Sequence, residues 1–130
     1  YLMPINKKYP IEKVLAAIDG YAAKTRRRVM IEYVLLKGVN DSLKCARQLA
    51  ELVRLRINFG LGARRPFCFI NLILYNNTND FKCSLPAQVK KFKDFLYTAG
   101  IMTTQRYRFG EDIEAACGQL AVSLPKLRRR

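Results

Sequence analysis

The sequence predicts an α/β fold, in which βα units build a parallel sheet. Three apolar, strand-like segments alternate with three segments of helical periodicity, and alternation of this kind is typical of βα units. At 130 residues, half of them hydrophobic, the chain suits one domain over residues 1–130 with a substantial core. Three strands are too few to close a barrel of eight, so we expect part of a barrel or of an open sheet.

The first helix and the first strand are predicted within residues 10–36. Pro10 suits the first position of a helix, because its fixed φ matches the helical value there. Apolar residues then recur at helical spacing as far as residue 24. Residues 28–36 are β-branched, aromatic and nearly all apolar, which indicates a strand that is buried on both faces.

A turn and a second helix are expected next. Residues 37–41 are turn-forming types, and Asn40 or Asp41 can cap the helix that we expect over residues 42–54. A basic loop over residues 55–66 then leads to a second continuous apolar strand at residues 67–74.

The third helix and the third strand complete the order helix, strand, helix, strand, helix, strand. Polar residues at 75–80 end the second strand. Pro86 opens the third helix, with Ser84 as a candidate N-cap, and Gly100 closes it where a left-handed backbone is needed. Residues 101–107 read as a weaker strand, and a tail follows.

The charge of the chain is strongly positive. Lys and Arg number 24 against 10 Asp and Glu, which gives a net charge of +14. An excess of this size favours a polyanionic partner such as nucleic acid, whereas a generally basic surface that keeps the protein in solution is the simpler alternative. The basic runs are spread along the chain, at residues 26–28, 64–65, 90–93 and 128–130.

Cysteine and histidine usage limits the chemistry. The four cysteines, at positions 45, 68, 83 and 117, form no CxxC or CxxxCxxC motif, so we expect no zinc site and no complete iron–sulfur site in this chain. Histidine is absent, which excludes hydrolytic triads that use it. No secretory signal and no run of 18 apolar residues is present, so we expect a cytoplasmic protein with reduced thiols and no membrane span. A start at Tyr1 instead of Met suggests part of a longer protein.

Two residues are candidates for a functional site. Cys117 lies among small residues ahead of a short terminal helix, where its sulfur is poorly shielded and Gly118 gives the backbone freedom. A gap-filling, inert cysteine is the alternative. Asn76 follows the second strand and Cys117 follows the third, so we expect both at the carboxyl edge of the sheet, where parallel α/β folds bind ligands.

Four segments together resemble the radical-SAM adenine methyltransferases of the RlmN/Cfr type. They are LMPINKKYP at 2–10, EYVLLKGVNDS at 32–42, INLILYN at 70–76 and GEDIEAACGQLA at 110–121. Members of this family methylate carbon 2, or in the Cfr branch carbon 8, of an adenine in 23S ribosomal RNA, and some also modify tRNA. The resemblance implies the C-terminal half of a partial (βα) radical-SAM barrel, with the CxxxCxxC that holds the [4Fe-4S] cluster in an N-terminal part outside this chain.

The resemblance also implies roles for Cys117 and Asn76. Cys117 matches the cysteine that is first methylated by one S-adenosylmethionine. A radical derived from a second S-adenosylmethionine at the cluster then activates the methyl group for addition to the adenine, and another cysteine resolves the adduct. Asn76 matches the asparagine that binds S-adenosylmethionine, and its amide can donate to and accept from the amino acid end or the ribose. The implied partners are ribosomal RNA, with tRNA as a second substrate in some members of the family, and a protein that reduces the cluster.

Some residues depart from the family pattern. The family usually has proline where Leu74 stands, and often has proline where Asn77 stands. The loop over residues 55–66 is longer and more basic than the usual connection. The other three cysteines match no family motif, so we expect Cys45, Cys68 and Cys83 to be packing residues. Two other functions stay open: a basic module that binds RNA without catalysis, and a degenerate fragment without activity.

Overall fold

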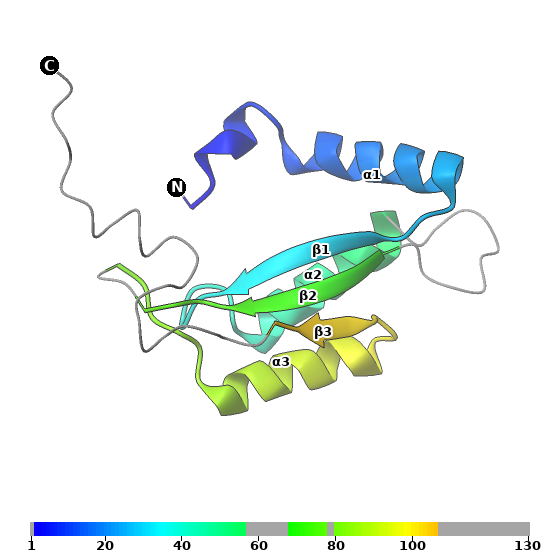
Figure 1. Ribbon diagram of the computed structural model, residues 1–130. Coiled ribbons are helices and arrows are strands. Elements are labelled where there is room, and N and C mark those ends of the chain that lie inside the picture. The colour runs from blue at the N-terminus through cyan, green and yellow to red at the C-terminus, as the bar shows by residue number, and fades with distance from the viewer. Residues whose placement is uncertain (1, 57–67, 78–79, 107–130) are drawn as a thin grey trace, which may run out of the picture.

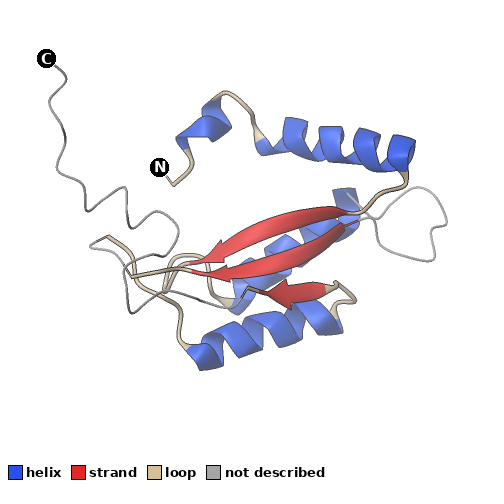
Figure 2. Ribbon diagram, in the orientation of Figure 1, coloured by secondary structure: helices blue, strands red, loops and turns tan. Residues whose placement is uncertain are grey.

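The computed structural model describes residues 2–56, 68–77 and 80–106, in which helices and strands alternate along the chain (Figures 1 and 2). A short 3-10 helix precedes the first βα unit. The elements are η1 (Pro4–Lys7), α1 (Ile11–Thr25), β1 (Val29–Leu35), α2 (Leu43–Arg56), β2 (Cys68–Leu74), α3 (Pro86–Thr98) and β3 (Thr103–Gln105). The predicted order and the α/β class are confirmed, and the terminal helix expected after Cys117 lies outside the described residues.

The three strands form one parallel sheet in the order β1-β2-β3. Ile70 of β2 lies in register with Ile31 of β1 and with Thr103 of β3. The Arg106 N–H continues the ladder past β3 by donating to the Leu72 carbonyl at 2.9 Å. In the described part of the chain β1 and β3 are therefore the two edges of the sheet, as the count of three strands predicts.

One hydrophobic core joins the sheet to all three long helices. Leu15 of α1, Val53 of α2 and Phe92 of α3 belong to the same buried cluster. The Phe92 ring is fully buried and lies 5.4 Å, centroid to centroid, from the ring of Tyr33 on β1. The strand residues of the cluster are Ile31, Tyr33 and Leu35 of β1 and Cys68, Ile70, Leu72 and Leu74 of β2. Because side chains alternate along a strand, these residues share one face of the sheet.

The prediction that β1 is buried on both faces is wrong. Met30, Glu32 and Val34 are exposed, although their neighbours in the strand pack into the core. The helices cover one face, and no helix of the described part of the chain covers the other. We call this other face the uncovered face; its residues are Met30, Glu32 and Val34 of β1, Phe69, Asn71 and Ile73 of β2, and Thr104 of β3. A hydrogen bond of 2.9 Å from the Thr104 hydroxyl to Asn71 Oδ1 crosses it between β3 and β2.

Two helix caps differ from the prediction. Ser42, instead of Asn40 or Asp41, caps α2, because its Oγ accepts the Cys45 N–H at 3.2 Å. Ser84 does not cap α3: Leu85 occupies the N-cap, and no side chain caps this end of the helix. At the other end of α3, Gly100 adopts φ of +78°, which confirms the predicted left-handed residue.

Candidate functional site

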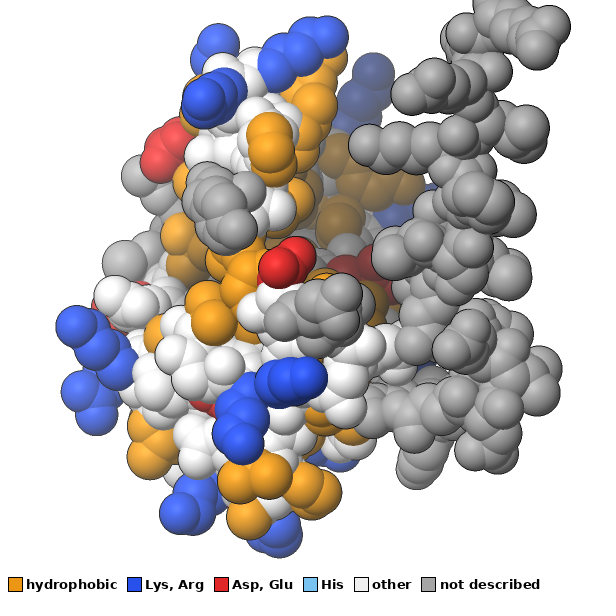
Figure 3. All heavy atoms as spheres, turned by 90° about the vertical axis from the view of Figure 1, so that its left-hand side faces the viewer, with side chains coloured by type: hydrophobic (Ala, Val, Ile, Leu, Met, Phe, Trp, Pro, Cys, Tyr) orange, Lys and Arg blue, Asp and Glu red, His pale blue; other side chains and the backbone are white. Residues whose placement is uncertain are grey.

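The carboxyl ends of the strands define the candidate site. In a parallel sheet these ends meet at one edge, and here β1, β2 and β3 end at Leu35, Leu74 and Gln105. The arrowheads in Figure 1 point toward this edge, and Figure 3 views the molecule from that side, where several Lys and Arg side chains lie on the surface. We call it the carboxyl edge. Ligands of parallel α/β folds bind at this edge.

Asn40 holds together the turn that follows β1. Its Oδ1 accepts the Leu36 N–H at 2.8 Å, and its Nδ2 donates to the Val34 carbonyl at 2.8 Å. The Tyr33 hydroxyl donates to the Asn40 carbonyl at 2.9 Å. In the same turn the Gly38 N–H donates to Asp41 Oδ1 at 3.0 Å, at a φ of +71° that favours glycine. The residue types predict this turn, with Asn40 or Asp41 as a helix cap; the Asn40 side chain instead fixes the end of the strand.

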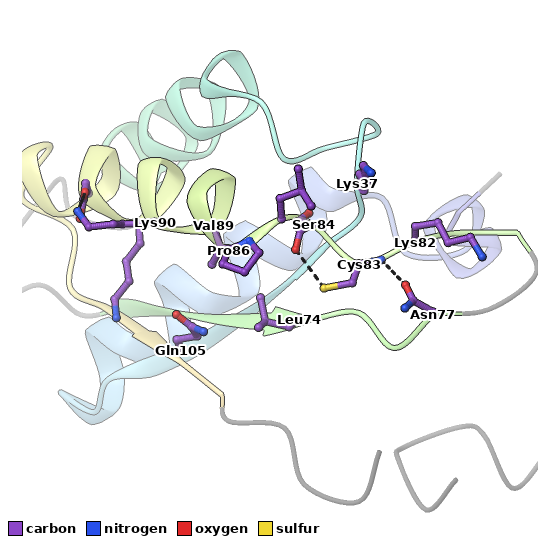
Figure 4. Close-up of a pocket in the computed structure, with 13 residues that line it drawn as sticks. Lys37, Leu74, Asn77, Lys82, Cys83, Ser84, Pro86, Val89, Lys90 and Gln105 are labelled. Carbon is purple, nitrogen blue, oxygen red and sulfur yellow. Dashed lines mark hydrogen bonds and ion pairs between the residues drawn. The ribbon is translucent and has the colours of Figure 1, made fainter. Parts of the chain in front are cut away.

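The segment before α3 returns to the carboxyl edge and pairs there with the residues that follow β1. Leu36 and Cys83 form an antiparallel bridge, and the Lys37 N–H donates to the Lys82 carbonyl at 3.0 Å. The Cys83 N–H donates to Asn77 Oδ1 at 2.7 Å (Figure 4). Asn77, one of the two departures from the family pattern, therefore ties the end of β2 to this returning segment. A proline side chain offers no acceptor for this bond.

Asn76 lies at the carboxyl edge, as predicted. It follows β2 by two residues and is half-buried. Cys117 lies outside the described residues, so the expected meeting of Cys117 and Asn76 at one edge stays a prediction.

A groove of about 1040 Å³ opens at the carboxyl edge; Asn77, the chain neighbour of Asn76, lines it. Lys37 from the end of β1, Leu74 and Asn77 from the end of β2, and Gln105 from the end of β3 contribute to its wall. The segment before α3 and the first turns of α3 complete the wall (Figure 4). No motif in the sequence predicts this groove. The signal that could have indicated it is the concentration of lysines on both sides of Pro86, which by itself shows only that the chain is basic.

The three cysteines of the described residues lie in different elements. Burial raises the pKa of Cys68 to about 11, with a smaller effect from Asp19, so its thiol is protonated and weakly nucleophilic at neutral pH. Cys45 is half-buried on α2, and its Sγ accepts a hydrogen bond from the Ser42 hydroxyl at 3.1 Å. Both fit the predicted packing role, whereas Cys83 lines the groove and its thiol donates to the Ser84 carbonyl at 3.1 Å.

These cysteines do not fit an iron–sulfur cluster. No group of three or more His, Cys, Asp or Glu residues in the described part of the chain could hold a metal ion. Within the same residues, no helix is long and apolar enough to cross a membrane.

Comparison with known proteins gives several relatives, although no protein-family model matches the chain. A probable dual-specificity RNA methyltransferase RlmN from Caldicellulosiruptor saccharolyticus is 42% identical over 92% of this chain. The corresponding protein of Thermoanaerobacter sp. (strain X514) is 45% identical over 92%, and that of Rhodopseudomonas palustris is 41% identical over 97%. Among solved structures, a radical SAM methyltransferase from Sphaerobacter thermophilus matches 91% of the chain with a TM-score of 0.78 and 40% identity.

The fold and the sequence identity together relate the chain to the radical-SAM methyltransferases. Within that class it is related to the dual-specificity RNA methyltransferases RlmN, as the sequence motifs predict. The chain spans about a third of the length of these relatives, with 32% of the Caldicellulosiruptor protein and 32% of the Sphaerobacter chain covered.

Proposed function

We propose that residues 1–130 form the C-terminal part of the catalytic domain of a radical-SAM RNA methyltransferase. The observation that carries the proposal is 45% identity to one such relative over 92% of the chain, together with a TM-score of 0.78 to a solved radical SAM methyltransferase. Because the match covers a third of each relative, methyl transfer would need residues beyond those that match this chain.

The proposed substrate is an adenine in 23S ribosomal RNA, methylated at carbon 2, with tRNA as a second substrate. Support comes from the RNA methyltransferase relatives and from the net charge of +14, which suits a polyanionic substrate. We propose that the protein acts in the cytoplasm. A separate reductant protein would serve the complete enzyme.

Asn76 is proposed to bind S-adenosylmethionine. A half-buried amide just past β2 suits the cofactor, because it can donate to and accept from the amino acid end or the ribose. S-adenosylmethionine, when bound, supplies the methyl group and the radical chemistry. The described cysteines do not form a cluster site, so this chain would contribute cofactor contacts and not the cluster.

Cys117 is proposed to carry the methyl group between cofactor and base. Its thiolate would accept the methyl group and later present it to the adenine carbon, which requires a sulfur on backbone that can move. The small residues 115–118 around it suit that movement.

A chimera tests the proposal, in which this chain replaces the matching third of the Caldicellulosiruptor relative. With cofactor, cluster and reductant supplied, we expect it to methylate 23S ribosomal RNA, as measured by mass spectrometry of the digested RNA. Cys117→Ser should abolish methyl transfer and leave RNA binding intact. The matched change Cys45→Ser on α2 should leave transfer in place.

Undiminished transfer by the Cys117→Ser chimera would refute the role of that cysteine. A chimera that binds a full complement of cofactor and cluster, and binds RNA, yet transfers no methyl group would instead favour the non-catalytic RNA-binding module. That alternative draws its support from the charge of the chain alone.

A further inference from the structure

The groove at the carboxyl edge carries more positive than negative charge. Four lysines line it: Lys37, Lys82, Lys90 and Lys93. Among the described residues that line it, Asp94 is the one acidic residue, and its carboxylate pairs with the Lys90 ammonium group. The groove therefore keeps an excess of lysine charge, which attracts anions.

The start of α3 adds a second source of positive potential. Helix α3 has 13 residues, and Leu85 and Pro86 at its beginning both line the groove. No side chain caps this end, and no acidic residue occupies the first turn. The positive end of the helix dipole is thus not offset by a carboxylate, and such an end favours phosphate groups.

The hydroxyl of Ser84 is a further polar feature of the groove, independent of the lysines. Ser84 is 3% exposed and lines the groove immediately before α3. Its Oγ is buried and has no hydrogen-bond partner among the described residues. A buried hydroxyl without a partner is costly, and native structures rarely keep one without a reason. A phosphate oxygen in the groove would supply that partner.

The groove lies close to the residues of the proposed active site. Leu74 and Asn77, which flank Asn76 in the chain, form part of its wall. An adenine that reaches the carboxyl edge of the sheet remains attached to its RNA strand, so the phosphates next to it must pass close to this edge.

We propose that this groove binds the phosphodiester backbone of the RNA substrate, through Lys37, Lys82 and Lys93, the Ser84 hydroxyl and the start of α3. The inference rests on the proposed function for the identity of the ligand as RNA. Lysine contributes compact positive charge, and the serine and the helix start contribute directional hydrogen bonds to phosphate oxygens.

The charge contribution is tested with the 130-residue chain and a fluorescein-labelled single-stranded RNA of 12 nucleotides. The groove variant carries Lys37→Gln, Lys82→Gln and Lys93→Gln; the matched control carries Lys13→Gln, Lys24→Gln and Lys44→Gln on α1 and α2. Both lose three positive charges. The slope of log Kd against log salt should fall by about 2 in the groove variant, roughly 0.7 for each phosphate contact on single strands. Between 50 and 200 mM salt the unaltered chain should therefore lose roughly 20-fold more affinity than the groove variant.

The serine is tested with Ser84→Ala and, as the matched change, Ser42→Ala. Ser84→Ala should weaken RNA binding by about tenfold, because one hydrogen bond to a charged oxygen is lost. It should not lower the Tm, because the removed hydroxyl has no partner in the free protein. Ser42→Ala should have the reverse profile, a lower Tm from the lost cap of α2 and unchanged RNA affinity.

Equal salt slopes for the groove variant and its control would overturn the proposal, as would unaltered RNA affinity in Ser84→Ala. The result is independent of methyl transfer by the chimera. A groove effect without methylation would leave the RNA site standing and remove the proposed chemistry, and methylation without a groove effect would do the opposite.

Discussion

At the scale of single residues, Asn40 shows how one polar side chain sets the shape of the carboxyl edge. It bonds the Leu36 N–H and the Val34 carbonyl, both at the end of β1. Asn40→Ala leaves this donor and this acceptor without partners, and we expect it to lower the free energy of unfolding by roughly 1–3 kcal/mol. Urea denaturation measures the loss.

Two variants of the same turn provide the controls for Asn40. Asn40→Asp keeps the acceptor for Leu36 and loses the donor to Val34, so its stability should lie between those of Ala and Asn. Val39→Ala, an exposed position in the same turn, should change little. A loss in Val39→Ala equal to that in Asn40→Ala would show that the turn is sensitive to any truncation and not to these hydrogen bonds.

Tyr33 and Cys68 make the stability of the fold depend on pH in the alkaline range. Burial raises the pKa of Tyr33 from 10.0 to about 12, with smaller effects from Cys45 and Asp41, and raises the pKa of Cys68 from 9.0 to about 11. Above pH 9 the unfolded chain therefore releases protons that the folded chain retains. The stability that the protonated Tyr33 and Cys68 contribute is fully present below pH 9, and it should be lost as pH rises through 11 and 12.

Denaturation between pH 8 and 11 measures this effect. The Tyr33→Phe, Cys68→Ala double variant should show a flatter dependence on pH than the unaltered chain, even if it is less stable overall. The same slope in both proteins would place the alkaline sensitivity in other groups.

The residue scale is where the sequence was least informative. The types in the turn at residues 37–41 predicted a turn, but only the backbone geometry decides that Ser42 caps α2 and that Asn40 turns back to β1. The burial of the Ser84 hydroxyl without a partner was likewise unpredictable, because it depends on how the segment before α3 packs against the end of β1.

At the scale of elements, periodicity predicted the alternation of helices and strands, and proline, glycine and turn residues predicted most of the bounds. Helix α3 begins at Pro86, because the fixed φ of proline suits the first turn of a helix. It ends before Gly100, because glycine readily adopts the left-handed backbone that follows a helix. The wrong prediction concerned which faces of strand β1 are buried. A run of apolar residues cannot show which strand face meets a helix, and Met30 and Val34 are exposed on the uncovered face.

The uncovered face predicts self-association of the isolated chain. It combines exposed apolar side chains with two strand edges, β1 and β3, in the described part of the sheet. We expect sedimentation velocity to show association that rises with protein concentration. Val34→Lys, at a position 39% exposed, should reduce it, and Val14→Lys on α1, at 40% exposed, should not. A monomer at every concentration, or equal effects of both changes, would contradict this expectation.

At the scale of the whole molecule, the relatives agree with the charge and the motifs of the chain. Periodicity and charge indicated a basic α/β domain with a polyanionic partner, and the motifs indicated the family. Similarity to RNA methyltransferases over 92% of the chain agrees with the motifs, and the match covers 32% of the length of the relative. Both Asn76 and the lysine-lined groove lie at the carboxyl edge, close to the ends of the strands.

The central claim is that Cys117 carries the methyl group, and mass spectrometry of the chimera tests it most directly. After incubation with S-adenosylmethionine, cluster and reductant, but without RNA, the protein is digested and its cysteine peptides are analysed. We predict one methyl group on Cys117 and none on Cys45, Cys68 or Cys83. An unmethylated Cys117 in a chimera that methylates RNA when RNA is added would contradict the claim.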